Sequence, residues 1–279
     1  MPFNHARFPG DGFNRNSRRP IWYSEATAYG ETMARKILLL LTLILAITLP
    51  LVAQQQTQPA KNADDEAGFV SIFDGKTLDG WKGDPKYWRA EGGELVGEIT
   101  PGNQIQENTF IIWQGGKTGD FELKLDYKIT EQGNSGINYR SSVVEGKPFV
   151  MKGYQFDIDG SRKNSGTTRH TGNNYEEKGR TFMALRGQIT RALEGGKRNV
   201  IGTLGDYTEM VKFVKENDWN TVHIIARGGT MIHMLNGQVM SILVDDDAAN
   251  RTMDGQLGVQ VHVGPPMKVE YRNIRIKKL

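Results

Sequence analysis

The chain contains no cysteine in 279 residues. Disulfide bridges, thiolate-held metal sites and a cysteine-linked lipid anchor are therefore all excluded. The main part of the chain also lacks any surplus of charge. Residues 1–53 carry six basic and three acidic residues, which leaves 29 of each (35 minus 6 and 32 minus 3) in the remainder. A neutral body gives no reason to expect binding to nucleic acid or to an anionic membrane surface.

Only one long apolar run is present, and it lies near the N-terminus. A basic start at Met33-Ala-Arg-Lys, a 13-residue run over 37–49 and a small residue at Ala53 are typical of a secretory signal. The run is shorter than the ~20 residues of a bilayer span. We therefore expect an N-terminal extension and signal peptide over 1–53, with translation starting at Met1 or Met33. We also expect export to the periplasm or the medium, with no membrane span after processing. The alternative is that the segment stays uncleaved as a membrane anchor.

The rest of the sequence is rich in glycine and poor in helical patterns. Residues 54–67 are polar and predict a disordered linker. Residues 68–279 contain about a dozen short alternating segments separated by turn signals, which predicts one antiparallel β-sandwich or barrel. Gly92-Gly93 and Asn236-Gly237 predict hairpin turns. Only 206–217 shows the apolar spacing of a short helix.

Polar side chains alternate with apolar ones in three of the expected strands. Because successive side chains of a strand point to opposite faces, each strand presents one polar row. The rows are Asn134, Gly136, Asn138 and Arg140; Gln155, Asp157 and Asp159; and Gln260 and His262. Amide, carboxylate and guanidinium groups in register with glycine suit a surface that grips a polyhydroxylated ligand. We therefore expect the functional site at these rows.

Several polar residues of the chain also have a simpler, structural interpretation. Arg140 could form an ion pair with Asp157 or Asp159 on the neighbouring strand. His223 and His233 lie beside apolar residues and fit satisfied histidines of a sheet. The run 245–247 of three aspartates resembles a calcium-type cluster but fits a solvated turn.

An ordered set of motifs carries a family resemblance over nearly all of 68–279. The motifs are FDGKTLDGW, DFELKLDYK, NSGINYR, KGYQFDID, TGNNYEE, DWNTVHIIARGG, HMLNGQ and GVQVHVGPPMKVEYRNIRIK. Together they resemble the 3-keto-disaccharide hydrolase domain family. The resemblance implies an all-β, antiparallel jelly-roll β-sandwich of the concanavalin A-like type, with the site on its concave sheet. It also implies an exported hydrolase or lyase acting on glycosides that carry a ketone at sugar carbon 3.

Such a ketone acidifies the hydrogen on carbon 2. A base removes this hydrogen, the glycosidic oxygen leaves carbon 1, and water then adds, so that the net result is hydrolysis. The candidate bases and acids are Asp157, Asp159, Glu176 and His262, and Arg140 is the candidate stabiliser of the enolate. The candidate substrate-binding residues are Asn134, Asn138, Gln155, Gln260, Tyr175 and His170. A divalent metal ion held by carboxylates and His262 is a further option.

Two other function classes stay open. The first is a non-catalytic carbohydrate-binding module, which the same fold also serves. The second is a retaining glucanase, which needs two carboxylates about 5–5.5 Å apart. Gln155 stands where the Glu-x-Asp-x-x-Glu pattern of such enzymes has its first glutamate. The expected partners are an oligosaccharide or glycoside substrate and, upstream, a sugar 3-dehydrogenase that supplies its ketone.

Overall fold

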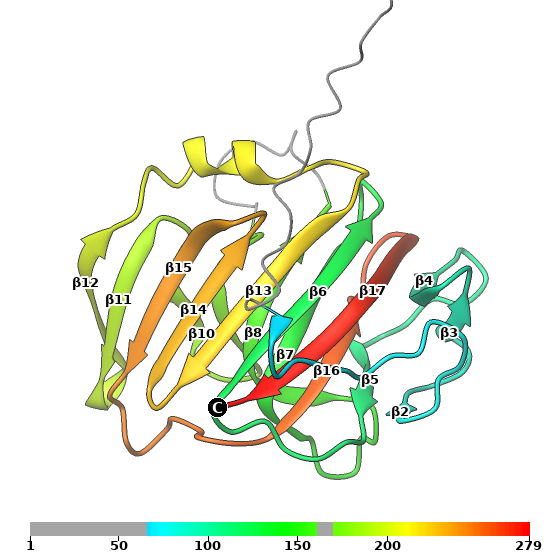
Figure 1. Ribbon diagram of the computed structural model, residues 1–279, viewed down its shortest axis with the longest axis horizontal. Coiled ribbons are helices and arrows are strands. Elements are labelled where there is room, and N and C mark those ends of the chain that lie inside the picture. The colour runs from blue at the N-terminus through cyan, green and yellow to red at the C-terminus, as the bar shows by residue number, and fades with distance from the viewer. Residues whose placement is uncertain (1–65, 161–169) are drawn as a thin grey trace, which may run out of the picture. The chain divides into compact units, whose positions relative to one another are not determined.

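The computed structural model describes residues 66–160 and 170–279 (Figure 1). The expected signal peptide over 1–53 and the expected linker up to residue 65 lie outside the described residues. Within the described residues, no helix is long and apolar enough to cross a membrane.

Two β-sheets pack face to face, as the alternating pattern predicts (Figure 1). In spatial order, the larger sheet contains β12 (Lys197–Thr203), β11 (Gln188–Leu193), β15 (Gln238–Asp245), β14 (Thr230–Leu235), β13 (Asn220–Arg227), β6 (Phe121–Ile129), β17 (Met267–Lys278), β4 (Glu94–Ile99) and β3 (Trp88–Glu91), with β1 (Val70–Ser71) paired to β17. The smaller sheet contains β10 (Thr181–Ala184), β9 (Asn174–Glu177), β8 (Met151–Asp159), β7 (Asn134–Val143), β16 (Gln256–Val261), β5 (Thr109–Trp113) and β2 (Trp81–Lys82). All pairs are antiparallel except β11 with β15. The all-β sandwich is confirmed, and its finer assignment as a jelly roll stays a prediction.

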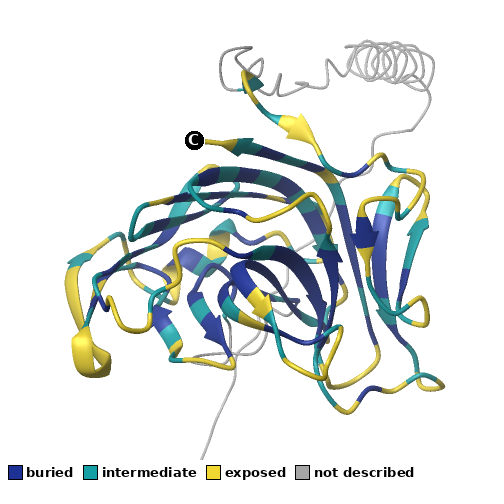
Figure 2. Ribbon diagram, turned by 90° about the horizontal axis from the view of Figure 1, so that it is seen from below, coloured by how far each residue is buried: buried dark blue, intermediate teal, exposed yellow. Residues whose placement is uncertain are grey.

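The core lies between the two sheets, and buried residues alternate with less buried ones along the central strands of the larger sheet, such as β6, β13 and β14 (Figure 2). In β6, every second residue from Phe121 to Ile129 is buried. In β8, Tyr154, Phe156 and Ile158 point inward and are at most 1% exposed. Because period two is fixed, the residues between them must point to the outer face of the smaller sheet.

The register of β7 against β8 brings two of the polar rows side by side. Asn134 pairs with Asp159, Gly136 with Asp157, and Asn138 with Gln155. Gly136 allows this close approach, since a Cβ there would lie 2.3 Å from Cδ of Gln155. The smaller sheet therefore carries its polar groups together on the face that points away from the core.

One histidine is part of the core, as its apolar neighbours predict. His233 is fully buried, its Nδ1 donates to the carbonyl of Asn173 at 3.1 Å, and its Nε2 lies 2.8 Å from the Tyr139 hydroxyl. Burial lowers the pKa of His233 to about 3, so that the ring is neutral. His223 is only half-buried and lies 2.8 Å from the Glu122 carboxylate.

Local turns agree with the sequence, whereas the expected helix is shorter and tighter. Asn236 and Gly237 adopt positive φ angles of 50° and 81° between β14 and β15, as a two-residue hairpin requires. The segment 206–217 contains the 3-10 helix η4 (Glu209–Phe213), not an α-helix. A second 3-10 helix, η3 (Glu194–Gly196), links β11 to β12.

Replacement of Phe156 by alanine tests the packing between the sheets. The Phe156 ring is fully buried, with its centroid 4.8 Å from that of His233. We expect the free energy of unfolding to fall by about 3–5 kcal/mol, because the substitution removes buried apolar surface and leaves a cavity. Denaturant titration measures this, with Val200→Ala as the control, since Val200 is 57% exposed on the edge strand β12. Equal effects of the two substitutions would contradict the two-sheet core.

Candidate active site

A cavity of about 530 Å³ opens on the outer face of the smaller sheet. Its walls come from β7, β8, β9 and β10 and from the segments around residues 108, 170 and 262. The lining residues are Asn108, Asn134, Gln155, Asp157, His170, Tyr175, Glu177, Lys178, Thr181, Phe182 and His262. Six of the eleven residues that the sequence nominates meet here: Asn134, Gln155, Asp157, His170, Tyr175 and His262.

Asp157 is a buried acid of this cavity whose pKa is shifted by its surroundings. Its side chain is only 7% exposed, and its Oδ1 accepts a hydrogen bond from Nε2 of Gln155 at 2.7 Å. Burial raises the pKa of Asp157 well above its usual value of 3.8; the hydrogen bond from Gln155 opposes this shift, and the charges of Glu177 and Asp159 add to it. Because Oδ1 already accepts this bond, Oδ2 is the oxygen left to carry a proton. The arrangement suits a carboxylic acid that donates.

A chain of buried amides supports Asp157 from beneath. Nε2 of Gln260 donates to Oε1 of Gln155 at 3.2 Å, and Gln155 in turn donates to Asp157. Gln260 is fully buried, and its Oε1 has no hydrogen-bond partner among the described residues. Gln260 therefore lies on the expected face but holds Gln155 instead of lining the cavity.

Glu177 is the second carboxylate of the cavity, and the sequence did not nominate it. Its side chain is buried, and its Oε1 accepts a hydrogen bond from Nδ2 of Asn108 at 3.1 Å. Oδ1 of Asn108 accepts from the backbone N–H of Val263, which fixes the orientation of this amide. Asn108 thus orients Glu177 and also ties it to the segment that carries His262.

Aromatic rings form another wall. The Phe182 ring centroid lies 5.0 Å from that of His170 and 5.1 Å from that of Tyr175. Burial lowers the pKa of His170, which favours its neutral form, and Nδ1 has no hydrogen-bond partner among the described residues. Burial also raises the pKa of Tyr175, so that its hydroxyl stays protonated. A neutral imidazole and a phenol beside an apolar ring can both hydrogen-bond and stack against a sugar.

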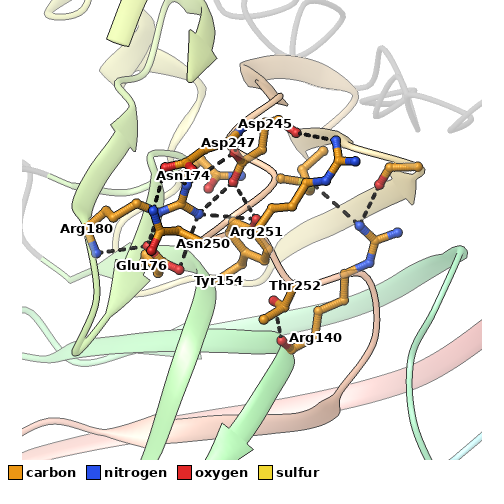
Figure 3. Close-up of polar contacts among 12 residues, drawn as sticks. Arg140, Tyr154, Asn174, Glu176, Arg180, Asp245, Asp247, Asn250, Arg251 and Thr252 are labelled. Carbon is orange, nitrogen blue, oxygen red and sulfur yellow. Dashed lines mark hydrogen bonds and ion pairs between the residues drawn. The ribbon is translucent and has the colours of Figure 1, made fainter. Parts of the chain in front are cut away.

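Glu176 is not at the cavity, because it points to the opposite side of β9. It forms an ion pair with Nε of Arg180 at 2.6 Å, and Arg180 also reaches Asp245 at 2.6 Å (Figure 3). Asp245 and Asp247 are fully buried, so the expected solvated turn at these two residues is wrong. Tyr175 and Glu176 are adjacent in one strand and could not both have faced the cavity.

Arg140 also lies outside the cavity. A β-bulge between Tyr139 and Ser142 interrupts the alternation, and Arg140 has a positive φ of 46°. Its guanidinium pairs with Asp120 at 2.9 Å and donates to the carbonyls of Gly119 and Gly228. Arg140 therefore does not line the cavity with the other candidates, and its ion pair is made with Asp120 instead of Asp157 or Asp159.

Two further nominated residues lie near the cavity without lining it. Asn138 is on the expected face but is fully buried and donates to Oγ of Ser141 at 3.4 Å. Asp159 is half-buried at the end of β8, and its charge acts on both Asp157 and His170.

The structure adds five lining residues that the sequence analysis missed. Glu177 could have been found by counting alternate residues from Tyr175. Asn108 lies in a loop, and Lys178, Thr181 and Phe182 are placed by the turn between β9 and β10, so that no periodic pattern marks them. Among residues 66–160 and 170–279, no three His, Asp or Glu side chains gather in a group that could hold a metal ion.

Comparison with known proteins identifies a family. Residues 68–277 match the model of the 3-keto-alpha-glucoside-1,2-lyase-like domain. A protein from Bacteroides thetaiotaomicron named 3-keto-disaccharide hydrolase is 34% identical over 94 residues. This match covers 30% of the present chain and only 31% of that relative.

Solved structures show a related fold at low identity. A protein from Parabacteroides distasonis, whose description as a glycosyl hydrolase is provisional, superposes with a TM-score of 0.51 at 19% identity, covering 76% of this chain and 99% of that one. A second such protein from the same organism gives a TM-score of 0.50 at 21% identity, with 78% and 97% covered. The family match over 68–277 therefore establishes that the chain belongs to the 3-keto-alpha-glucoside-1,2-lyase-like domain family.

Proposed function

We propose that this chain is an exported enzyme that cleaves 3-keto-glycosides by removing the proton on sugar carbon 2. The family supports a carbohydrate-active hydrolase or lyase. Two buried carboxyl groups, those of Asp157 and Glu177, line the same cavity of about 530 Å³, and this observation carries the proposal. That volume is within the range of small-molecule sites.

The two carboxyl groups divide the chemistry between them. Glu177, whose Oε1 accepts from Asn108, is the base that takes the proton from carbon 2. The electron pair of that C–H bond passes to the ketone oxygen as an enolate, and collapse of the enolate forms a double bond between carbons 1 and 2 as the glycosidic oxygen leaves. Asp157, whose pKa burial raises, gives its proton to that oxygen. Water then adds to carbon 1 and a proton returns to carbon 2, which completes a net hydrolysis.

The other lining residues bind and orient the sugar. The Asn134 amide is a donor on the cavity wall and would stabilise the enolate oxygen that develops from the ketone, whereas Nζ of Lys178 already donates to Glu107 at 2.7 Å. His262 is half-exposed at the mouth, with its Nδ1 2.6 Å from the carbonyl oxygen of Val263. It is placed to bind a hydroxyl or relay a proton. Asp159 influences Asp157 through its charge instead of touching the substrate.

The proposed substrate must be made by an earlier reaction. A ketone at sugar carbon 3 arises by oxidation of a secondary alcohol, so that a dehydrogenase or oxidase of sugars must act first. The signal-like segment before residue 54 supports a reaction in the periplasm or outside the cell.

Incubation of the full chain with a disaccharide and with its 3-keto form tests the activity. We expect cleavage of the keto form alone, because only the ketone acidifies carbon 2. Product analysis by chromatography, with and without chelator, measures it. Cleavage of the unoxidised disaccharide would indicate an ordinary glycosidase instead. Binding of either sugar without cleavage would indicate a binding module.

Replacement of Asp157 by asparagine tests its protonation. We expect kcat to fall by about 10²–10⁴-fold, because the variant has no proton to donate. The raised pKa makes the protonated form the one that the fold stabilises. The wild-type stability linked to this group is therefore fully present below about pH 4 and is lost as pH rises through the folded-state pKa.

Asparagine does not ionise, so that Asp157→Asn should gain free energy of unfolding over wild type as pH rises from about 4 to 8. Denaturant titrations at both values measure this gain. The control is Asp79→Asn, an exposed position that should change neither stability nor kcat. A gain that does not depend on pH, or undiminished turnover, would contradict the assignment of Asp157.

A further inference from the structure

The hairpin of β9 and β10 supplies nearly half of the cavity wall. Five of the eleven lining residues come from it: Tyr175, Glu177, Lys178, Thr181 and Phe182. The hairpin also forms the edge of the smaller sheet, where β8 is the one strand among the described residues that supports it by main-chain pairing. An edge hairpin that supplies so many lining side chains needs a further contact to keep them in place.

The turn of this hairpin is strained at two cavity positions. Lys178 has a φ of 52° and Thr181 a φ of 65°, in the left-handed region. That region is uncommon for any residue with a Cβ and is a genuine outlier for a β-branched one such as threonine. Glycine or asparagine would adopt it at lower cost. Strain of this kind persists only where the surroundings hold it, and it gathers at sites of function.

Arg180 provides that restraint from the side of the hairpin opposite the cavity. Its backbone N–H and its Nε both donate to Oε2 of Glu176, at 2.8 and 2.6 Å. Its Nη2 reaches Oδ2 of Asp245 at 2.6 Å and the hydroxyl of Tyr154 at 3.3 Å, and its Nη1 lies 3.5 Å from Asp247 (Figure 3).

These contacts join three strands from both sheets. Glu176 is on β9, Tyr154 on β8 of the same sheet, and Asp245 on β15 of the larger sheet. Asp245 is fully buried, and the side chain of Arg180 is 15% exposed. A planar guanidinium can serve several acceptors in fixed directions, which a lysine ammonium cannot do. The clamp therefore fixes the turn in orientation as well as in position.

We propose that Arg180 is a positioning residue of the active site, and that the strained Thr181 it holds in place contacts the bound sugar. Arg180 sets the direction of Glu177, because Glu176 and Glu177 are adjacent and point to opposite faces of β9. Thr181 lines the cavity, and in this proposal it hydrogen-bonds a sugar hydroxyl. This inference rests on the proposed cleavage of 3-keto-glycosides.

The test compares two arginines that form the same kind of ion pair and are equally exposed. Arg180 forms its Nε–Oε2 ion pair with Glu176 at 2.6 Å and is 15% exposed; Arg275 forms the same pair with Glu66 at 2.6 Å and is 14% exposed. Arg275 is on β17 of the larger sheet and has no part in the cavity. With the 3-keto-disaccharide, Arg180→Lys should lower kcat by up to about 100-fold with little change in KM, since the base is misdirected. Arg275→Lys should change neither constant.

Thr181→Gly is the second variant and is expected to fold at least as well as wild type. Glycine adopts the positive φ freely, so the midpoint of thermal unfolding should rise. KM should rise about tenfold with kcat little changed, because a contact made equally in the ground and transition states is lost. Thr181→Ser, which keeps the hydroxyl, should restore most of the affinity.

Hydrogen exchange of the amides of 177–183 separates this inference from the proposed function. Arg180→Lys should speed their exchange and Arg275→Lys should not, whether or not the protein cleaves the keto sugar. Unchanged exchange in Arg180→Lys overturns the clamp. Equal KM in Thr181→Gly and wild type overturns the contact. If the wild-type protein leaves the 3-keto-disaccharide intact, the proposed function is overturned, and the contact of Thr181 with it. The exchange data still decide the role of Arg180 in that case.

Discussion

The strict alternation of side chains along β8 and β9 is the constraint on which the site depends. It sends Tyr154, Phe156 and Glu176 toward the larger sheet and Gln155, Asp157 and Glu177 toward the cavity. One strand thereby serves both the core and the site. A shift of register by one residue would exchange the two sets, burying the cavity acids in the core and exposing the aromatic rings.

The same alternation lets the folded protein contain groups at the cavity that lower its free energy of unfolding. Asp157 is buried beside other acids, and two non-glycine residues of the β9–β10 turn have positive φ. Both features disfavour folding, and both occur at the cavity. They are offset on the inner face, where Arg180 joins Glu176 to Asp245 and where apolar packing is dense. The core thus stabilises an arrangement that the site alone could not maintain.

The sequence predicts the sandwich and much of one wall of the site, because both depend on period two. The rows that contain Asp157 and Gln260 lie on the expected face. Prediction fails where the backbone departs from that period: the bulge near Arg140 turns this side chain toward Asp120, and the turn after Glu177 brings Lys178 and Thr181 to the cavity. Glu176 is a different case, since counting from Tyr175 would have selected Glu177. Asn108 reaches the site from a loop, and its contacts depend on distant residues that no local pattern reveals.

Removal of the proton at sugar carbon 2 by Glu177 is the step on which the proposed cleavage depends. Turnover of a 3-keto-disaccharide in D₂O, followed by NMR of the sugar product, measures this step directly against a reaction without enzyme. We predict one deuterium at carbon 2 for each bond cleaved by the wild-type chain, and exchange no faster than without enzyme for Glu177→Gln. A product that keeps its original hydrogen at carbon 2 would show that the glycosidic bond breaks without this proton transfer, and would contradict the account.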